Sequence, residues 1–481
     1  MSPARVLIVF PASLYGRAWA AGPRVKPELV SLLTHLRRHE VEAGVLDLEV
    51  EIGNPGAGDE QEFLRRAEEL LAAADAEVFA FDCWTSLQYS ATIALAEIVR
   101  RRHPPAVIAV AGYHPTSRPA DFSYSGSPVN WLLEGEAENA LLQVALAVAG
   151  GDTDVTGCRA IEGAPLEHTL ADAPDYHAYP YVGEGLDTLG IYLSRGCPYH
   201  VTACLLRPGG SGWHAYPPAA ALTMLDDLAA LKPGVVEVLD PTFGYDNGWR
   251  IAMLEKLAET YRRAVPLSIT ARPDALTRND LDKIYSASMR LRFDVETLSP
   301  TLLSRREIVA SPDRYVEHAL DLLGYANAKG VPTSVGLVFN QPGETVETAA
   351  QTIAVLRDFA QAVPNTSIRL RAESWAYFPF GEPVADIDAP ASRFGTVIMH
   401  PEWWKEPVPS EAAAKAVLAS TELGGRQPGD ESYWRPKFAE VAQLLESKLT
   451  AEARRGYRSH ESVGSAATGV PNGWWIEGRW H

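Results

Sequence analysis

The chain has 481 residues, which at about 150 residues per domain suggests roughly three domains. Hydrophobic residues make up 46% of the composition and charged residues 22%, which is typical of folded globular proteins and excludes disordered and fibrous classes. The formal net charge of −18 opposes binding to nucleic acid and to anionic membrane surfaces, so we expect neither as a partner. The N-terminal segment lacks the long apolar run of a secretory signal, so we expect a cytoplasmic protein.

Residues 1–150 alternate short apolar runs with longer amphipathic segments, a pattern that predicts an α/β domain with a doubly wound parallel sheet. The expected strands are Arg5–Phe10, Ala43–Leu48, Val78–Asp82, Val107–Ala111 and Trp131–Leu133. The expected helices are Pro27–His39, Glu60–Ala74, Tyr89–His103 and a last one that ends at Ala149. Ligands of such sheets bind beyond the carboxyl ends of the strands, so the loops there are the candidate binding segments.

Residues 151–185 are rich in Gly, Pro and Asp without a sustained period, and we interpret them as a linker. From residue 186 to 385 the alternation of strands and helices resumes without a dinucleotide glycine fingerprint, which predicts a partial (β/α)6 barrel. Its expected strands are Leu189–Ser194, Val235–Asp240, Leu267–Ala271, Leu291–Glu296, Thr333–Phe339 and Ile368–Leu370. The less regular residues 386–481 form a C-terminal extension.

Short motifs in both halves match one family in their order and spacing. They are Lys26–Pro27, Val45–Asp47, Gly112–Thr116, Glu134–Glu138, Asp172–Tyr176, Ser194–Tyr199, Asp240–Gly244, Phe293–Thr297 and Gln341–Thr345. From about residue 5 to residue 385 the chain resembles the cobalamin-binding radical S-adenosylmethionine (SAM) enzymes. The resemblance implies a Rossmann-like cobalamin-binding domain over residues 1–150 and a barrel of radical SAM type over residues 186–385. It makes cobalamin the expected cofactor and SAM a candidate second ligand.

The resemblance places the cobalamin site in the loops after three strands of the first sheet. The candidate residues are Cys83, Trp84, Thr85, Ser86, Gly112, Tyr113, His114, Glu134, Gly135 and Glu136. Gly112 and Gly135 lack a Cβ and therefore permit a large ligand to approach the backbone, although tight turns without a ligand are the alternative. Residues 11–22 contain no His for cobalt, so we expect the loop after Asp82 to meet the lower cobalt face. The alternative is that Cys83 and Trp84 only pack.

The loop that carries the cluster ligands in the family departs from its pattern. Radical SAM enzymes hold a 4Fe-4S cluster with three cysteines spaced C-x-x-x-C-x-x-C. Here Cys197 and Cys204 occupy the outer positions, but Val201 occupies the middle one and has no lone pair for iron. We therefore expect the cluster to be labile or absent, with Cys197 and Cys204 as remnant ligands. His200 is an alternative nitrogen donor.

Without a cluster there is no route for an electron into SAM. We expect a cobalamin-dependent, methyltransferase-like enzyme that transfers a methyl or related group to a small molecule of specialised metabolism without a radical step. Two alternatives stay open. One is a cobalamin-binding or scaffold protein whose active site is lost, and the other is a radical SAM methyltransferase with a rescued cluster.

Three polar residues fall at the ends of successive barrel strands, where side chains converge on a ligand. Asp240, Arg272 and Glu296 are the candidate catalytic residues, with Arg272 suited to bind a carboxylate. The alternative is that Arg272 and Glu296 form a buried ion pair. His214 is a further polar candidate. Several side chains are candidates to close a substrate cavity, or alternatively to belong to the core: Trp375, Tyr377, His400, Trp403 and Trp404.

Overall fold

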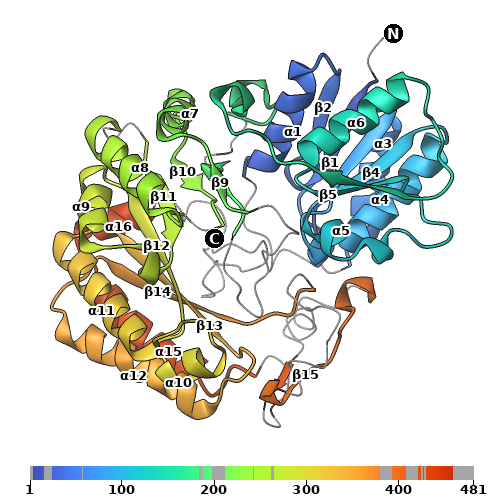
Figure 1. Ribbon diagram of the computed structural model, residues 1–481. Helices are drawn as coiled ribbons and strands as arrows, with labels where there is room; N and C mark the ends of the chain where they lie inside the picture. Colours follow the sequence, from blue (N-terminus) through green and yellow to red (C-terminus); the bar gives the residue numbers. More distant parts are fainter. Residues whose placement is uncertain are drawn as a thin grey trace.

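The computed structural model describes residues 4–15, 24–56, 58–183, 186, 188–197, 212–241, 243–261, 265–379, 393–407, 421–423, 426 and 430–458. Over these residues the chain forms two six-stranded parallel sheets, each with its own helices, and the two halves lie side by side (Figure 1). This confirms the predicted α/β class. None of the helices in the described ranges combines the length and the apolar character needed to cross a membrane.

The first sheet, blue to teal in Figure 1, is fully parallel and has the strand order β2-β1-β3-β4-β5-β6. Its strands are β1 (Val6–Phe10), β2 (Ala43–Asp47), β3 (Val78–Asp82), β4 (Val107–Ala111), β5 (Trp131–Gly135) and β6 (Arg159–Gly163). Its helices are α1 (Pro27–Arg38), α2 (Leu48–Glu51), α3 (Glu60–Ala72), α4 (Tyr89–Arg102), α5 (Tyr113–Ser117) and α6 (Ala137–Ala149). Helices α1 and α6 pack together, as do α3 and α4, in two separate apolar clusters. Every residue of β3 and β4 is buried, as expected for central strands of a parallel sheet.

Strand β6 lies within the segment 151–185 that the sequence analysis interpreted as a linker. It pairs in parallel with β5 along its whole length and completes the first sheet. Its side chains are half-buried or exposed throughout, because it is an edge strand, and it lacks the apolar run that marks the other strands. The interpretation of this segment as a linker is therefore wrong for residues 159–163. The four predicted domain ranges stay a prediction.

The second sheet is also fully parallel, with the order β7-β10-β11-β12-β13-β14, as the partial (β/α)6 barrel requires. Its strands are β7 (Thr188–Ile191), β10 (Val235–Val238), β11 (Leu267–Ala271), β12 (Arg290–Glu296), β13 (Thr333–Phe339) and β14 (Ile368–Ser374). Its helices are α7 (Pro218–Ala230), α8 (Asn247–Thr260), α9 (Arg278–Ser286), α10 (Pro300–Arg305), α11 (Pro312–Lys329) and α12 (Val346–Ala362). A short antiparallel ribbon of β8 (Ser194–Arg195) and β9 (His214–Ala215) adjoins it.

The first barrel strand is shorter than the sequence pattern indicates. It ends at Ile191. Two residues later, the backbone amide of Leu193 donates to the Asp240 carboxylate at 2.7 Å instead of to a neighbouring strand. The hydroxyl of Ser194 donates to the same carboxylate at 2.6 Å. These bonds turn the chain out of the sheet and into β8.

The C-terminal extension contacts both halves. Helix α15 (Arg435–Ser447) packs on α12 and β14, and α16 (Ala451–Arg458) follows it. The ribbon of β15 (Thr396–Ile398) and β16 (Thr421–Leu423) lies at the other end of the extension (Figure 1). Trp403 and Trp404 are fully buried, and their carbonyl oxygens accept hydrogen bonds of 2.7 Å from Tyr15 and Ser90 of the first half. The extension therefore joins the two halves through core residues.

Candidate functional site

A cavity of about 100 Å³ lies where the carboxyl ends of the two sheets face each other. The first half contributes the loops after β3, β4 and β5 together with helix α1, and the second half contributes the residues that follow β7 and β10. This is the edge at which ligands of parallel sheets bind. The residues of the two halves that line it include Trp84, Gly112, Tyr113, Gly135, Glu136, Tyr192, Arg195, Gly196 and Pro241.

Aromatic rings and backbone form the wall of the cavity on the side of the first sheet. The rings of Trp84 and Tyr113 meet edge to face with centroids 4.5 Å apart. Gly112 has a φ of 116°, and a Cβ there would lie 2.3 Å from the carbonyl oxygen of Cys83. Glycine is thus required at position 112 because two loops pack closely against each other there, beside the cavity. The result is a wall that carries flat apolar rings.

Four of the predicted cofactor-binding residues lie behind this wall and do not line the cavity: Cys83, Thr85, Ser86 and His114. The two ring nitrogens of His114 lie 2.7 Å from the Ser86 hydroxyl and 3.1 Å from the Asp121 carboxylate. Burial lowers the pKa of His114 below its ordinary value. The Thr85 side chain caps the turn that begins at Ser86. These residues hold the Trp84 loop in place. Glu134 lies within β5 and is half-buried.

An ionic network borders the cavity where the first half meets the ribbon of β8 and β9. The Arg195 guanidinium lies 3.0 Å from Glu136 and 2.8 Å from Glu138, and His214 lies 2.8 Å from the other Glu136 oxygen. Burial opposes ionisation of Glu136, but the adjacent His214 ring and the Arg195 charge lower its pKa to about 2. Burial, together with Arg195, lowers the pKa of His168 to about 4. The sequence analysis singled out Glu136 and His214 but missed Arg195, Glu138 and His168.

The three candidate catalytic residues of the barrel have protein partners and are not among the residues that line the cavity. Asp240 holds the end of β7 as described above, and burial raises its pKa to about 7. Arg272 forms a two-point ion pair with Asp274, with both distances 2.9 Å. Glu296 lies 3.7 Å from Arg306. In the structure, Arg272 therefore pairs with Asp274 and Glu296 pairs with Arg306, so the two residues do not form the ion pair with each other that was the alternative.

One acidic side chain on β12 was missed by the sequence analysis. Asp294 lies between the buried Phe293 and Val295, and the pairing of β12 with β13 shifts register between Asp294 and Glu296. Its Oδ1 atom is buried and has no hydrogen-bond partner among the described residues, and burial raises its pKa well above the ordinary value. Buried carboxylates are normally paired, so this atom is available to a ligand. The alternation of polar and apolar residues along β12 was the available signal.

Of the predicted cluster ligands, Cys197 is half-buried and directly follows Gly196, which lines the cavity. Cys204, Val201 and His200 lie outside the described residues.

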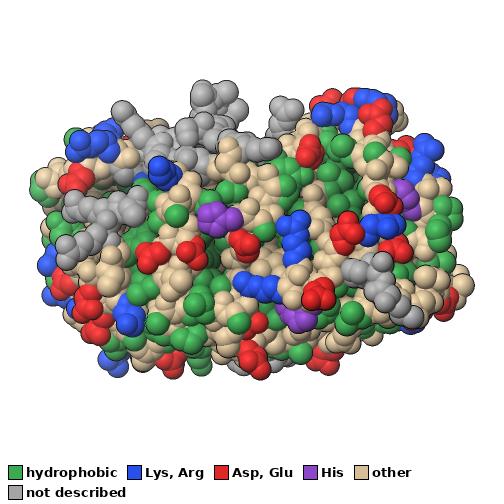
Figure 2. Space-filling model, turned by 90° about the horizontal axis from the view of Figure 1, so that it is seen from above, with side chains coloured by type: hydrophobic (Ala, Val, Ile, Leu, Met, Phe, Trp, Pro, Cys, Tyr) green, Lys and Arg blue, Asp and Glu red, His purple; other side chains and the backbone are tan. Residues whose placement is uncertain are grey.

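Figure 2 shows one face of the molecule, on which lysine and arginine side chains alternate with aspartate and glutamate rather than gathering into a continuous basic stripe.

The fold is similar to that of solved radical SAM methyltransferases. TsrM from Kitasatospora setae, a radical S-adenosylmethionine methyltransferase with cobalamin and a 4Fe-4S cluster bound, matches with a TM-score of 0.65 and 17% identity over 81% of this chain and 78% of that chain. TsrM with tryptophan substrate and a SAM analogue bound matches with a TM-score of 0.66 and 15% identity over 96% and 98%. OxsB, a cobalamin-dependent SAM radical enzyme with aqua-cobalamin and SAM bound, matches with a TM-score of 0.60 and 15% identity over 82% and 56%.

The chain shares the fold of these enzymes. This confirms, at the level of architecture, the resemblance and the fold class that the sequence motifs indicate. No protein-family model matches the chain. A curated relative from Streptantibioticus cattleyicolor, 2-(S-pantetheinyl)-carbapenam-3-carboxylate methyltransferase, is 26% identical over 150 residues, which cover 27% of this chain. The match spans 22% of that relative's length.

Proposed function

We propose that the chain is a cobalamin-dependent methyltransferase that uses SAM as methyl source and acts on a small molecule. The observation that carries this proposal is the cavity shared by the two halves, with the Trp84 and Tyr113 wall on one side and Arg195, Gly196 and Pro241 on the other. The folds that this chain resembles belong to proteins described with cobalamin and SAM bound, and the curated relative is a methyltransferase.

The cavity wall offers aromatic contacts to a corrin. A flat, largely apolar macrocycle packs well on aromatic rings, and the Trp84 and Tyr113 rings supply them. Trp84 is the residue of the predicted lower-face loop that lines the cavity, so it is the residue of that loop that would contact the corrinoid. His114 keeps both ring nitrogens engaged within the protein and does not serve cobalt. Gly112, Tyr113, Glu134 and Gly135 complete the proposed cobalamin site, in which Cys83, Thr85, Ser86 and His114 act as positioning residues.

When bound, cobalamin supplies an electrophilic methyl group to a positioned nucleophile. The residues of the chain contribute binding and orientation. Asp294 and Glu296 near the carboxyl end of β12 accept hydrogen bonds from amine or hydroxyl groups of SAM or the substrate. The Arg272 guanidinium, which pairs with Asp274, is the candidate group to bind a carboxylate of SAM or of the substrate. Asp240 acts as a positioning residue because both of its oxygens hold the start of β8.

We propose further that methyl transfer proceeds without a radical step. The support is the Val201 side chain, which has no donor atom at the middle position of the cysteine motif. A rescued cluster is the second candidate, favoured by Cys197 and Cys204 at the two outer positions.

Reconstitution with hydroxocobalamin tests the cobalamin site. The full chain is mixed with the corrinoid, passed through gel filtration and examined by visible absorption. We expect one corrinoid per chain for the natural sequence. Trp84→Ala weakens binding about tenfold, which is about 1.4 kcal/mol. The matched control is Trp131→Ala, a half-buried tryptophan at the amino end of β5, away from the cavity. Colourless protein with an intact fold would refute the proposal.

The cluster is tested separately by assaying iron and sulfide after anaerobic reconstitution. We expect substoichiometric iron and no 5′-deoxyadenosine from SAM. About four irons and four sulfides per chain would instead establish the rescued cluster, and 5′-deoxyadenosine formed from SAM would establish the radical mechanism.

A further inference from the structure

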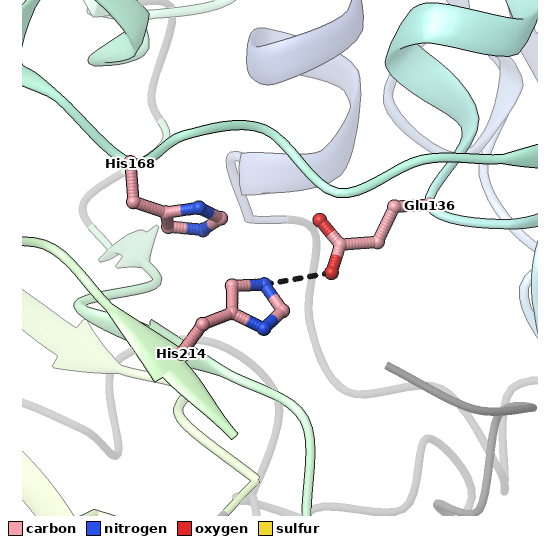
Figure 3. Close-up of side chains that lie close together, drawn as sticks. All are labelled: Glu136, His168 and His214. Atoms are coloured by element: carbon pink, nitrogen blue, oxygen red, sulfur yellow. Dashed lines mark ion pairs between the residues drawn. The ribbon is translucent and has the colours of Figure 1, made fainter. Parts of the chain in front are cut away.

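Glu136, His168 and His214 converge at the edge of the cavity (Figure 3). Glu136 follows β5, His168 lies in the segment between the two sheets, and His214 begins β9. One donor atom of each residue lies within 4.8 Å of those of the other two. Three segments that are far apart in the sequence therefore bring two imidazoles and a carboxylate to one point.

The hydrogen bonds of the two rings decide which nitrogen is free. Nδ1 of His168 lies 2.7 Å from the carbonyl oxygen of Leu166, and Nδ1 of His214 lies 2.8 Å from that of Gly212. A carbonyl oxygen can only accept, so both Nδ1 atoms carry a proton and donate it. Each Nε2 atom of a neutral ring consequently offers a lone pair. A carbonyl partner on the second nitrogen is the arrangement that orients metal-binding histidines.

The charges around the cluster require a cation. Within the part of the chain that the structure describes, Nε2 of His168 is buried without a hydrogen-bond partner. Nε2 of His214 lies 2.8 Å from a carboxylate oxygen of Glu136. Two lone pairs at this distance repel each other, so either a second proton on His214 or a metal ion must lie between them. The Arg195 guanidinium faces two carboxylates, those of Glu136 and Glu138. With neutral imidazoles, this group of side chains therefore has an excess negative charge.

We propose that Glu136, His168 and His214 bind a divalent transition-metal ion, with Zn²⁺ as the best match to the donors. Two imidazole nitrogens and one carboxylate oxygen form the protein part of a four-coordinate zinc site and leave the fourth position to water. Mg²⁺ and Ca²⁺ select oxygen ligands and fit this set poorly. The proposal does not rest on the proposed cobalamin chemistry.

The ion joins the two halves of the cavity. Glu136 belongs to the loop after β5, whereas His214 belongs to β9, which pairs with Arg195 of β8. Both Glu136 and Arg195 line the cavity. Coordination therefore ties the β8 and β9 ribbon of the barrel half to the first sheet, and His168 fastens the segment between the sheets to the same point.

Zinc binding by the full chain tests the proposal. The protein is stripped with a chelator, titrated with Zn²⁺ alone and assayed for metal after gel filtration. We expect one bound zinc per chain, and at least a tenfold loss of affinity in His168→Gln and in Glu136→Gln. The matched control is His177→Gln, because His177 is exposed in the same segment between the sheets and only its backbone amide is hydrogen-bonded to Asp175. Equal zinc binding by His168→Gln and the natural sequence would overturn the proposal.

Cobalt substitution provides a second test, which uses the natural sequence and therefore does not depend on whether a variant folds. Co²⁺ bound by imidazole and carboxylate shows visible ligand-field bands without a thiolate charge-transfer band, whereas Co²⁺ bound by Cys197 or Cys204 shows that band. We expect the first spectrum. The thiolate spectrum would place the metal at the cysteine loop and overturn the proposal. Failure of the natural sequence to bind zinc or cobalt would also overturn it, and would leave a protonated His214 as the cation.

Discussion

Two buried histidine sites lie beside the same cavity and differ in how their hydrogen-bonding capacity is used. His114 has one ring nitrogen on Ser86 and the other on Asp121, all within the first half. His168 has one nitrogen on a backbone carbonyl, while the other is buried with no partner and points toward His214 and Glu136. Both side chains are at most 2% exposed. Burial alone therefore does not separate them, whereas the number of satisfied ring nitrogens does.

The difference indicates how a structural polar residue is told apart from a ligand-binding one. A fully satisfied network stabilises the fold, because removing one member leaves its partners buried without a bond. A buried atom without a partner costs free energy until a ligand supplies the missing bond. By this criterion we expect substitutions at the His114 site to have the largest effect on stability and substitution of His168 to have the smallest.

Replacing His114 should cost the most. His114→Ala leaves Ser86 and Asp121 without their partner and opens a cavity among Tyr89, Phe122 and Trp404, whose rings lie around it. We expect the free energy of unfolding to fall by about 3 kcal/mol. Urea denaturation followed by tryptophan fluorescence measures it. A change within about 0.5 kcal/mol of the natural sequence would contradict the structural role assigned to His114.

We expect the unfolding free energy to depend on pH through Asp121, the carboxylate partner of His114. Burial favours the neutral form of Asp121, but hydrogen bonds from His114 and Lys405 outweigh it and lower the pKa from 3.8 to about 2. A lowered carboxyl pKa stabilises the fold above the unfolded value, and this stabilisation is lost as the pH falls from about 4 to 2. The difference in unfolding free energy between the natural sequence and Asp121→Asn should therefore shrink by about 2 kcal/mol over that range. Denaturation midpoints at successive pH values measure this, and a constant difference would contradict it.

The same criterion applied to the barrel distinguishes Asp294 from Asp240. Asp294 has an unpartnered Oδ1, whereas both Asp240 oxygens are bonded. We expect Asp294→Asn to weaken SAM binding about tenfold, as measured by calorimetry, without lowering the melting temperature. Asp240→Asn, by contrast, should lower the melting temperature, because an amide nitrogen cannot accept the hydrogen bond that a carboxylate oxygen accepts now. The reverse pattern would show that partner satisfaction does not identify ligand-binding residues in this chain.

The smallest effect is expected for His168 in metal-free protein. His168→Ala removes one hydrogen bond to Leu166 and an atom that has no partner, so the free energy of unfolding should fall by about 1 kcal/mol or less. Added Zn²⁺ should raise the melting temperature of the natural sequence but not that of the variant. If His168→Ala in metal-free protein costs as much as His114→Ala, the contrast between the two sites is broken.

Elements with a strong local pattern could be predicted from the sequence. Val78–Asp82 and Val107–Ala111 are expected with the bounds that β3 and β4 have, because a central strand buried on both faces is a short continuous apolar run. Helices α1 and α4 begin at the expected residue and end one residue before the expected end, because an apolar stripe repeats every turn. Strand β6 was not predicted, because an edge strand needs no apolar run. Its backbone pairing with β5 is a tertiary contact that the local sequence does not show.

The motifs determined the family resemblance and the loops that meet at the cavity, because order and spacing along the chain are properties of the sequence itself. Only the tertiary structure decided which side chains of those loops reach the cavity. Trp84 lines it while the neighbouring Cys83 and Thr85 lie behind it, and Trp403 and Trp404 turned out to be core, docked on the first half. The convergence of Glu136, His168 and His214 has no sequence signature, because their three segments share no period and meet only when the two halves pack together.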